Sequence, residues 1–111
     1  MAEVVWNKQA ENEWRKKMLY GLDEFGQTTA IRFVQRTNDI VKIIRKHPKA
    51  GLREPLLRNK KKIYRYFHLV GSLKLLYYYV ESSDTIRIAD IWDSRREPSK
   101  LQKRVDQGTV L

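Results

Sequence analysis

The chain has 111 residues, of which 41% are hydrophobic, and its 23 Lys and Arg residues outnumber its 13 Asp and Glu residues, for a net charge of +10. This length allows one hydrophobic core, and three Trp, six Tyr and three Phe are too many for a disordered chain. Because cysteine is absent, disulfides, thiolate metal sites and cysteine nucleophiles are excluded.

The start of the chain predicts a short strand and then a helix. Val4, Val5 and Trp6 favour a strand, and Asn7 is a candidate helix cap. Over residues 8–25 apolar side chains recur at helical spacing and predict one buried stripe. The stripe contains Ala10, Trp14, Met18, Leu22 and Phe25, and Gly26 suits the end of the helix.

A second helix is predicted from about residue 27, capped by Thr28 or Thr29, to just before Pro48, which disfavours helical geometry at the preceding residue. Its expected buried face contains Ala30, Phe33, Val34, Thr37, Val41 and Ile44. The short link predicts an antiparallel helix hairpin. Residues 48–62 hold two prolines and a glycine and form a connector, from which we expect Leu56 and Leu57 to reach the core.

Three strands are predicted over residues 63–70, 73–80 and 85–92, and their short connections require antiparallel pairing. Both faces of the middle strand are apolar. One face has Leu73, Leu75, Tyr77 and Tyr79, and the other has Leu76, Tyr78 and Val80 beside Lys74. Because a helix hairpin covers one face, the other needs the chain's own tail or a partner.

The expected architecture is an α+β domain over residues 1–98, in which the short N-terminal strand and the helix hairpin pack with a mainly antiparallel sheet. Residues 99–111 are expected to be a partly disordered tail with weak helical character near residues 101–105. The N-terminus lacks the pattern of a signal peptide, and the longest apolar run, residues 75–80, is too short to span a bilayer. We therefore expect a cytoplasmic protein with no membrane partner.

The positive charge is concentrated in one segment. Residues 42–65 contain ten basic residues and one acidic residue, whereas residues 1–41 contain six of each. Such clustering favours a polyanionic partner such as nucleic acid, the ribosome or an acidic protein. The candidate RNA-binding residues are Arg58, Lys60, Lys61, Lys62 and Arg96. The alternative for Lys60, Lys61 and Lys62 is a solvated lysine-rich loop.

No hydrolase elbow, phosphate loop or dinucleotide motif occurs, and the sequence predicts neither a metal site nor a cofactor. The remaining chemical feature is a set of cations on the predicted sheet and directly after it. Cleavage of RNA needs a base, charge stabilisation at the phosphate and an acid, because the attacking 2′-hydroxyl comes from the substrate. Arginine suits the second role, but the sequence offers no clear base.

The order of elements resembles that of the RelE/ParE superfamily of bacterial toxins from type II toxin–antitoxin modules, over about residues 4–101. Three stretches carry the resemblance. They are His47-Pro48-Lys49-Ala50-Gly51, then Tyr64-Arg65-Tyr66 with Leu73-Lys74-Leu75-Leu76-Tyr77-Tyr78, and Ile88-Ala89-Asp90-Ile91-Trp92-Asp93-Ser94-Arg95-Arg96-Glu97-Pro98.

The resemblance implies one of two activities. RelE-like members cleave mRNA in the ribosomal A site, and their catalytic cations fall on Arg65, Lys74 and Arg95. Phe67 stands where a further basic residue is expected, and no tyrosine follows Arg95 in the tail, so two parts of the ribonuclease pattern are missing. ParE-like members inhibit DNA gyrase without that set. The charge of +10 suits ribosomal RNA, and both activities stay open.

The resemblance also implies a partner, an acidic antitoxin with a flexible segment that folds onto the toxin. The apolar sheet face and the basic surface both suit such a segment. The alternative outside the toxins is a small basic RNA-binding module whose tyrosine-rich strands stack bases, in which Tyr78 is a key residue.

Overall fold

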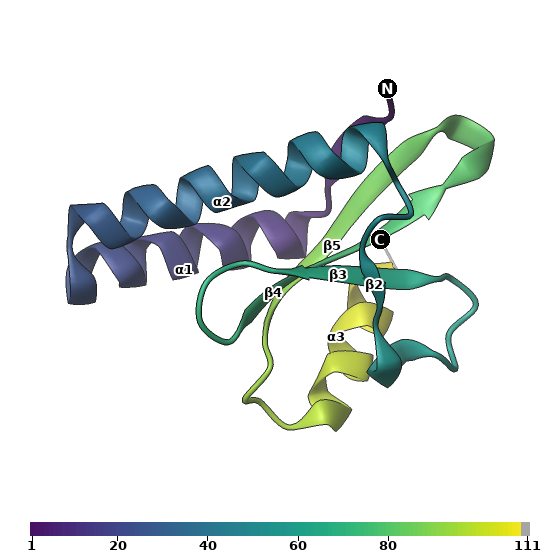
Figure 1. The fold of residues 1–111 in the computed structure, drawn as a ribbon. Coiled ribbons are helices and arrows are strands. Elements are labelled where there is room, and N and C mark those ends of the chain that lie inside the picture. The colour runs from purple at the N-terminus through teal and green to yellow at the C-terminus, as the bar shows by residue number, and fades with distance from the viewer. Residues whose placement is uncertain (110–111) are drawn as a thin grey trace.

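The computed structural model describes residues 1–109 as a five-stranded sheet with helices on both faces (Figure 1). The strands are β1 (Glu3–Trp6), β2 (Leu52–Arg53), β3 (Tyr64–His68), β4 (Leu73–Val80) and β5 (Thr85–Asp93). The helices are α1 (Lys8–Phe25), α2 (Gln27–Lys46) and α3 (Pro98–Thr109), with short 3-10 turns at Pro55–Leu57 and Glu81–Ser83. The predicted α+β class is confirmed.

The sheet has the order β1-β5-β4-β3-β2. β1 pairs parallel with β5, and the other neighbours pair antiparallel, as the short links from β3 to β5 require. The predicted three-stranded meander is therefore confirmed. The edge strand β2 was not predicted, because the connector that contains it reads as irregular.

The helix hairpin is confirmed, but its caps differ from those expected. α2 begins at Gln27 directly after Gly26, whose φ of 89° lets the chain reverse, so the predicted caps Thr28 and Thr29 lie inside the helix. Asn7 does precede α1, yet its side chain caps no backbone N–H. The Asn7 side-chain oxygen instead accepts a hydrogen bond from Arg87 Nη1 at 3.3 Å.

One face of the sheet packs against the hairpin. The core there joins Ala10 of α1 and Phe33, Ile40 and Ile44 of α2 to Leu75, Tyr77, Ile86, Ile88 and Ile91 of the sheet. Trp14 and Met18 lie partly buried at the edge of this core. The rest of the predicted α1 stripe is wrong, because Leu22 and Phe25 are exposed where the hairpin runs past the sheet (Figure 1).

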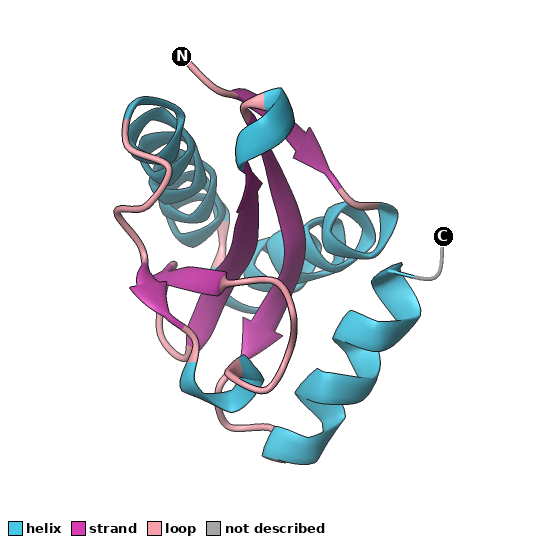
Figure 2. Cartoon of the chain, turned by 90° about the vertical axis from the view of Figure 1, so that its right-hand side faces the viewer, coloured by secondary structure: helices cyan, strands magenta, loops and turns pink. Residues whose placement is uncertain are grey.

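The opposite face is covered by the chain's own C-terminal segment (Figure 2). Residues 99–109, expected to be part of a tail, form most of α3, while residues 110 and 111 lie outside the described part. Leu101 and Val105 of α3 are buried in a second core. Its other buried members are Leu57, Tyr64, Leu76, Tyr78, Ala89 and Trp92. The second apolar face of β4 is therefore internal.

Candidate functional site

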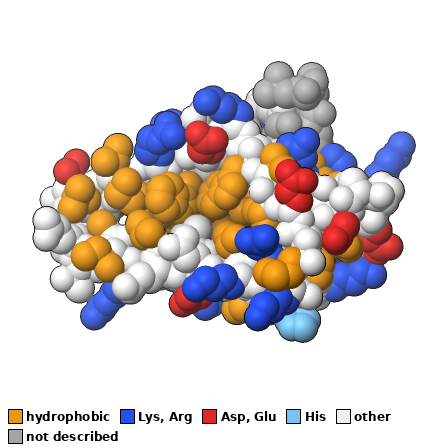
Figure 3. Space-filling view, turned by 90° about the horizontal axis from the view of Figure 1, so that it is seen from above, with side chains coloured by type: hydrophobic (Ala, Val, Ile, Leu, Met, Phe, Trp, Pro, Cys, Tyr) orange, Lys and Arg blue, Asp and Glu red, His pale blue; other side chains and the backbone are white. Residues whose placement is uncertain are grey.

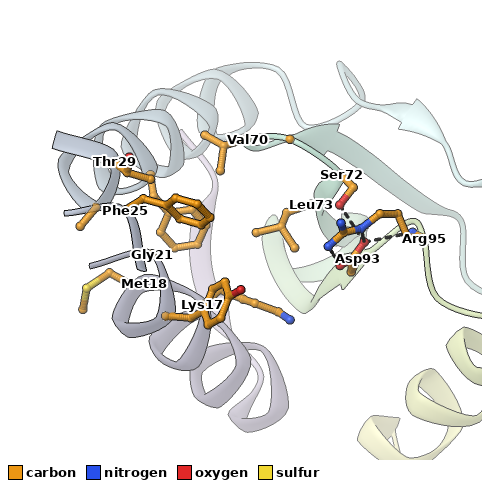
Figure 4. A pocket seen from close by; sticks show the side chains of 14 residues that line it. Lys17, Met18, Gly21, Phe25, Thr29, Val70, Ser72, Leu73, Asp93 and Arg95 are labelled. Atoms are coloured by element: carbon orange, nitrogen blue, oxygen red, sulfur yellow. Dashed lines mark hydrogen bonds and ion pairs between the residues drawn. The ribbon is translucent and has the colours of Figure 1, made fainter. Parts of the chain in front are cut away.

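A groove lies between the far end of the hairpin and the end of the sheet, with a cavity of about 370 Å³ (Figure 4). Three parts of the chain form its wall: the last turns of α1 with the first turns of α2, the β3–β4 turn, and the end of β5. The lining includes Met18, Tyr20, Phe25, Phe33, Val70 and Leu73, with Lys17, Asp93 and Arg95 as its charged members. The groove is thus apolar inside and charged at its rim.

The groove stays open because the hairpin is longer than the sheet it covers. Leu19, Tyr20, Phe25 and Ile31 belong to these distal turns and are exposed, with Phe25 at 65%. The rings of Tyr20 and Phe25 contact edge to face, with centroids 6.2 Å apart. Figure 3, which views the molecule from above, shows hydrophobic side chains gathered over the hairpin. Such an apolar surface on a small protein is typical of a docking site.

A network of polar contacts fixes the rim of the groove beside β5. The Asp93 carboxylate accepts hydrogen bonds from Ser72 Oγ at 2.8 Å, from the Arg95 backbone N–H at 3.0 Å, and from Arg95 Nη2 at 2.9 Å. The Arg95 guanidinium holds the pKa of Asp93 well below its usual range, and Asp93 in turn raises the pKa of Arg95. Arg95 is nevertheless 79% exposed, so its guanidinium remains available to a partner.

The first of the predicted catalytic cations, Arg65, binds the connector. Its Nη1 donates to the Gly51 carbonyl at 3.0 Å. The Gly51 N–H donates to the Tyr77 hydroxyl at 2.9 Å, and that hydroxyl donates to the Pro48 carbonyl. A Cβ at position 51 would lie 2.7 Å from the Tyr77 hydroxyl, so this position requires glycine. Burial raises the pKa of Tyr77 above the usual Tyr value, and the hydroxyl is a protonated donor at neutral pH in either case.

The second, Lys74, lies on the other face of the sheet. Arg65 pairs with Tyr77 of the hairpin-side core, whereas Lys74 pairs with Trp92 of the α3-side core. The Lys74 ammonium donates to both carboxylate oxygens of the fully buried Glu54 at 3.1 and 3.2 Å. It also lies 4.2 Å from the centre of the Tyr66 ring. Its charge is therefore balanced inside the protein.

The third, Arg95, follows β5 at the groove. The structure thus places Arg65, Lys74 and Arg95 in three environments, each with an internal acceptor: a backbone carbonyl, Glu54 and Asp93. Opposite sheet faces separate the first two, and neither of them lines the groove that Arg95 borders. The three cations do not converge on one space in which a phosphate would sit.

The predicted RNA-binding residues divide between two places. Arg58, Lys60, Lys61 and Lys62 belong to the loop before β3, where Lys60 Nζ contacts the Asp106 carboxylate of α3 at 2.9 Å. Lys62 lies 4.4 Å from the centre of the Tyr78 ring. Arg96 is apart from this group and lies over Trp92, with its guanidinium carbon 4.8 Å from the ring centre.

Across residues 1–109, no helix combines the length and apolar character needed to cross a membrane. The same residues contain no cluster of three or more His, Asp or Glu side chains suited to hold a metal ion.

The groove itself was missed by the sequence analysis, although a signal was present. α1 has more apolar residues than one buried stripe needs, since Leu19 and Tyr20 stand outside it. A second apolar face on a helix indicates a contact beyond the intramolecular core. The position of this face relative to the sheet end depends on tertiary structure and cannot be predicted from the spacing of apolar residues along α1.

Comparison with known proteins relates this architecture to a family. The family model for the ParE toxin of the type II toxin–antitoxin system parDE matches residues 4–98, which extends from within β1 through β5 and ends where α3 begins. A search of curated proteins finds no match. Since the family match covers most of the chain, and the observed order of strands and helices is consistent with the RelE/ParE fold, the chain belongs to the ParE toxin family of type II toxin–antitoxin systems.

Proposed function

We propose that this toxin arrests growth by inhibiting DNA gyrase and does not cleave mRNA. The observation that carries the proposal is the placement of Arg65 and Lys74 on opposite faces of the sheet. A ribonuclease needs several charged groups directed at one phosphate, because charge stabilisation falls off with distance. The ParE family match supports the same choice.

The internal partners of the cations support this reading further. Glu54 has no exposed side-chain surface, so any movement of Lys74 toward a substrate would leave a buried carboxylate without its cation. Arg65 holds Gly51 next to Tyr77, so its reorientation would release the connector. Both residues therefore act in the stability of the fold.

The RNA-stacking module is disfavoured by the burial of the tyrosines. Tyr78 is 8% exposed and Tyr64 is 3% exposed, and the two rings pack edge to face in the core beneath α3. Base stacking needs an open ring face on the surface. Of the three tyrosines of β4, Tyr77 is also fully buried and only Tyr79 is partly exposed, so the strand does not supply a platform of several rings.

As a type II toxin the protein has a cognate antitoxin. We assign the groove to a segment of that antitoxin that has an apolar face and acidic flanks. The wall offers Phe25, Val70 and Leu73 to apolar side chains, and the rim offers Lys17 and the exposed Arg95 to carboxylates. The sequence analysis expected either the chain's own tail or a partner on the second sheet face. The tail, as α3, covers that face, so the antitoxin segment is assigned to the groove.

The test is to add the purified protein to two reactions in parallel. In the first, gyrase supercoils relaxed plasmid; in the second, purified ribosomes translate an mRNA whose integrity is followed on a sequencing gel. We expect supercoiling to be inhibited while the mRNA stays intact, and antitoxin should reverse the inhibition. The control for the second reaction is the variant Arg95→Ala.

The opposite pattern would overturn the proposal. Cuts in the mRNA that depend on ribosomes and disappear in Arg95→Ala, together with normal supercoiling, would identify a RelE-like nuclease. That result would also require Arg65 and Lys74 to rearrange in the ribosome-bound state.

A further inference from the structure

A basic surface lies on the side of the molecule away from the groove, where the loop before β3 meets α3. We define this basic loop surface by Arg58, Lys60, Lys61, Lys62, Lys103 and Asp106. Lys60 Nζ contacts both oxygens of Asp106, at 2.9 and 3.0 Å, and so joins the loop to α3. Lys103 lies one turn before Asp106 on the same side of α3 and is exposed.

The positive charge of this surface is mostly uncompensated. It contains five cations and one carboxylate, that of Asp106. Across the described residues, the side chains of Arg58 and Lys61 make no hydrogen bond or ion pair, and both are exposed. A depression of about 230 Å³ runs between the three lysines of the loop and Asp106. Fixed cations around a shallow depression favour a partner with regularly spaced negative charges.

The aromatic residues beside these cations decide which polyanion fits. Tyr64 lines the depression but is buried, and burial together with Tyr78 raises its pKa to about 12. Lys62 covers the Tyr78 ring, 4.4 Å from its centre. The surface therefore offers charge without ring faces. Proteins that bind single-stranded nucleic acid combine cations with aromatic rings on which bases stack, whereas duplex can be held through its phosphates without ring contacts, so the surface fits duplex.

We propose that the basic loop surface binds the phosphate backbone of duplex DNA, namely the DNA segment that gyrase holds while the toxin acts on it. The proposal rests on the proposed inhibition of gyrase. The surface lies outside the groove: its residues come from the loop before β3 and from α3, and none of them lines the groove. The toxin can therefore contact DNA without occupying the antitoxin site.

Binding of the whole protein to a short fluorescein-labelled DNA duplex, followed by anisotropy from about 50 to 200 mM salt, tests the contact directly. Removing one cation that touches a phosphate should reduce the slope of log affinity against log salt by about one. The variant Arg58→Gln/Lys61→Gln should therefore bind more weakly, with a slope lower by about two and no dependence on DNA sequence. Both side chains are exposed, so the melting temperature should not change.

The matched control is Arg32→Gln/Lys42→Gln, which removes one Arg and one Lys from α2, on the other face of the sheet. It has the same net charge as the test variant and should keep the slope of the wild type. Equal losses in the two variants would overturn the proposal, because binding would then follow net charge alone. Tighter binding to single-stranded RNA of equal length would overturn it in favour of an RNA partner.

A gyrase reaction with the same proteins separates this proposal from the one on which it rests. If the wild type and the control variant inhibit gyrase and Arg58→Gln/Lys61→Gln does not, the result supports both gyrase inhibition and the DNA contact. Full inhibition by the test variant would overturn the DNA contact and leave gyrase inhibition intact. The wild type could also fail to inhibit gyrase but bind duplex with the expected slope. That result would overturn both gyrase inhibition and the contact with gyrase-held DNA, and it would support duplex binding by the basic loop surface.

Discussion

On the α3 side of the sheet the covering helix buries its apolar side chains in the core, whereas on the hairpin side two longer helices run past the strands (Figure 1). Leu101 of α3 is fully buried, yet Phe25 at the end of α1 is 65% exposed. The same class of side chain thus serves the fold on one face and remains available for contact on the other. The exposed apolar surface, to which we assign the antitoxin, is on the hairpin, and the α3 face is part of the core.

The polar contacts differ in the same way. Beneath α3, the Arg104 guanidinium forms two short hydrogen bonds to the buried Asp90 carboxylate, at 2.6 and 2.7 Å, and lies 3.6 Å from Glu13 of α1. At the groove, the Arg95–Asp93 pair has an exposed guanidinium. The first pair fastens a helix to the sheet, and the second shapes a rim. The consequences of removing each pair should differ accordingly.

The largest effect is expected from Arg104→Met. The substitution leaves the Asp90 carboxylate buried without its cation, which should reduce the free energy of unfolding by about 3–5 kcal/mol, measured by urea denaturation. Lys103→Met, on the exposed side of the same turn, is the matched control and should change it by less than about 0.5 kcal/mol. An equal effect of the two variants would show that the ion pair does not hold α3.

The same variant should respond to pH. Burial raises the pKa of Asp90, and Arg104 opposes that rise, so its loss raises the pKa further. A carboxyl group whose pKa is higher in the folded than in the unfolded state binds its proton more tightly when the protein is folded. The free energy of unfolding then falls as the pH increases. The free energy of unfolding that Arg104→Met loses relative to the wild type should therefore be smaller at pH 5 than at pH 8.

Two variants with smaller expected effects on stability compare the two apolar faces directly. Leu101→Ala creates a cavity in the core and should cost about 2–5 kcal/mol of unfolding free energy. Phe25→Ala removes a larger side chain, but an exposed one, and should cost less than about 0.5 kcal/mol. Its effect should appear in antitoxin binding, measured by calorimetry, as a loss of about 2 kcal/mol. Unchanged antitoxin affinity in Phe25→Ala would place the partner elsewhere.

The sequence is sufficient where structure depends on neighbours in the chain. The bounds of α1 and β4 follow from apolar spacing and from the Gly26 and Gly71 turns, because both are local. The resemblance to the RelE/ParE superfamily rests on motif order, and the family match over residues 4–98 confirms it.

The remaining features depend on contacts between distant segments. β2 has two residues and exists through pairing of Leu52 with Tyr66, which no local pattern marks. The sequence predicts Lys74 as an unpaired cation on a strand. Glu54 neutralises it from twenty positions earlier, and this contact forms only when the connector is folded. The exposure of Phe25 depends on where the sheet ends beneath the hairpin. The candidate catalytic residues, chosen by their charge and by the resemblance to RelE-like members, therefore lie apart in the fold.

The smallest effect is expected at the rim, from Asp93→Asn. The Arg95 guanidinium depresses the pKa of Asp93, so the carboxylate adds stability above the usual Asp pKa, and this stability is lost as pH falls through the folded pKa. Asp93→Asn should thus melt below the wild type at pH 7, and the two curves should converge from pH 4 toward pH 2. Because Arg95 is exposed, water screens the ion pair, and Asp93→Asn should destabilise the protein less than Leu101→Ala does.

The control is Asp23→Asn, which removes an exposed carboxylate on α1 and should have the melting temperature of the wild type at every pH. A constant gap between Asp93→Asn and the wild type at every pH would mean that the Asp93 hydrogen bonds, and not its charge, maintain the rim.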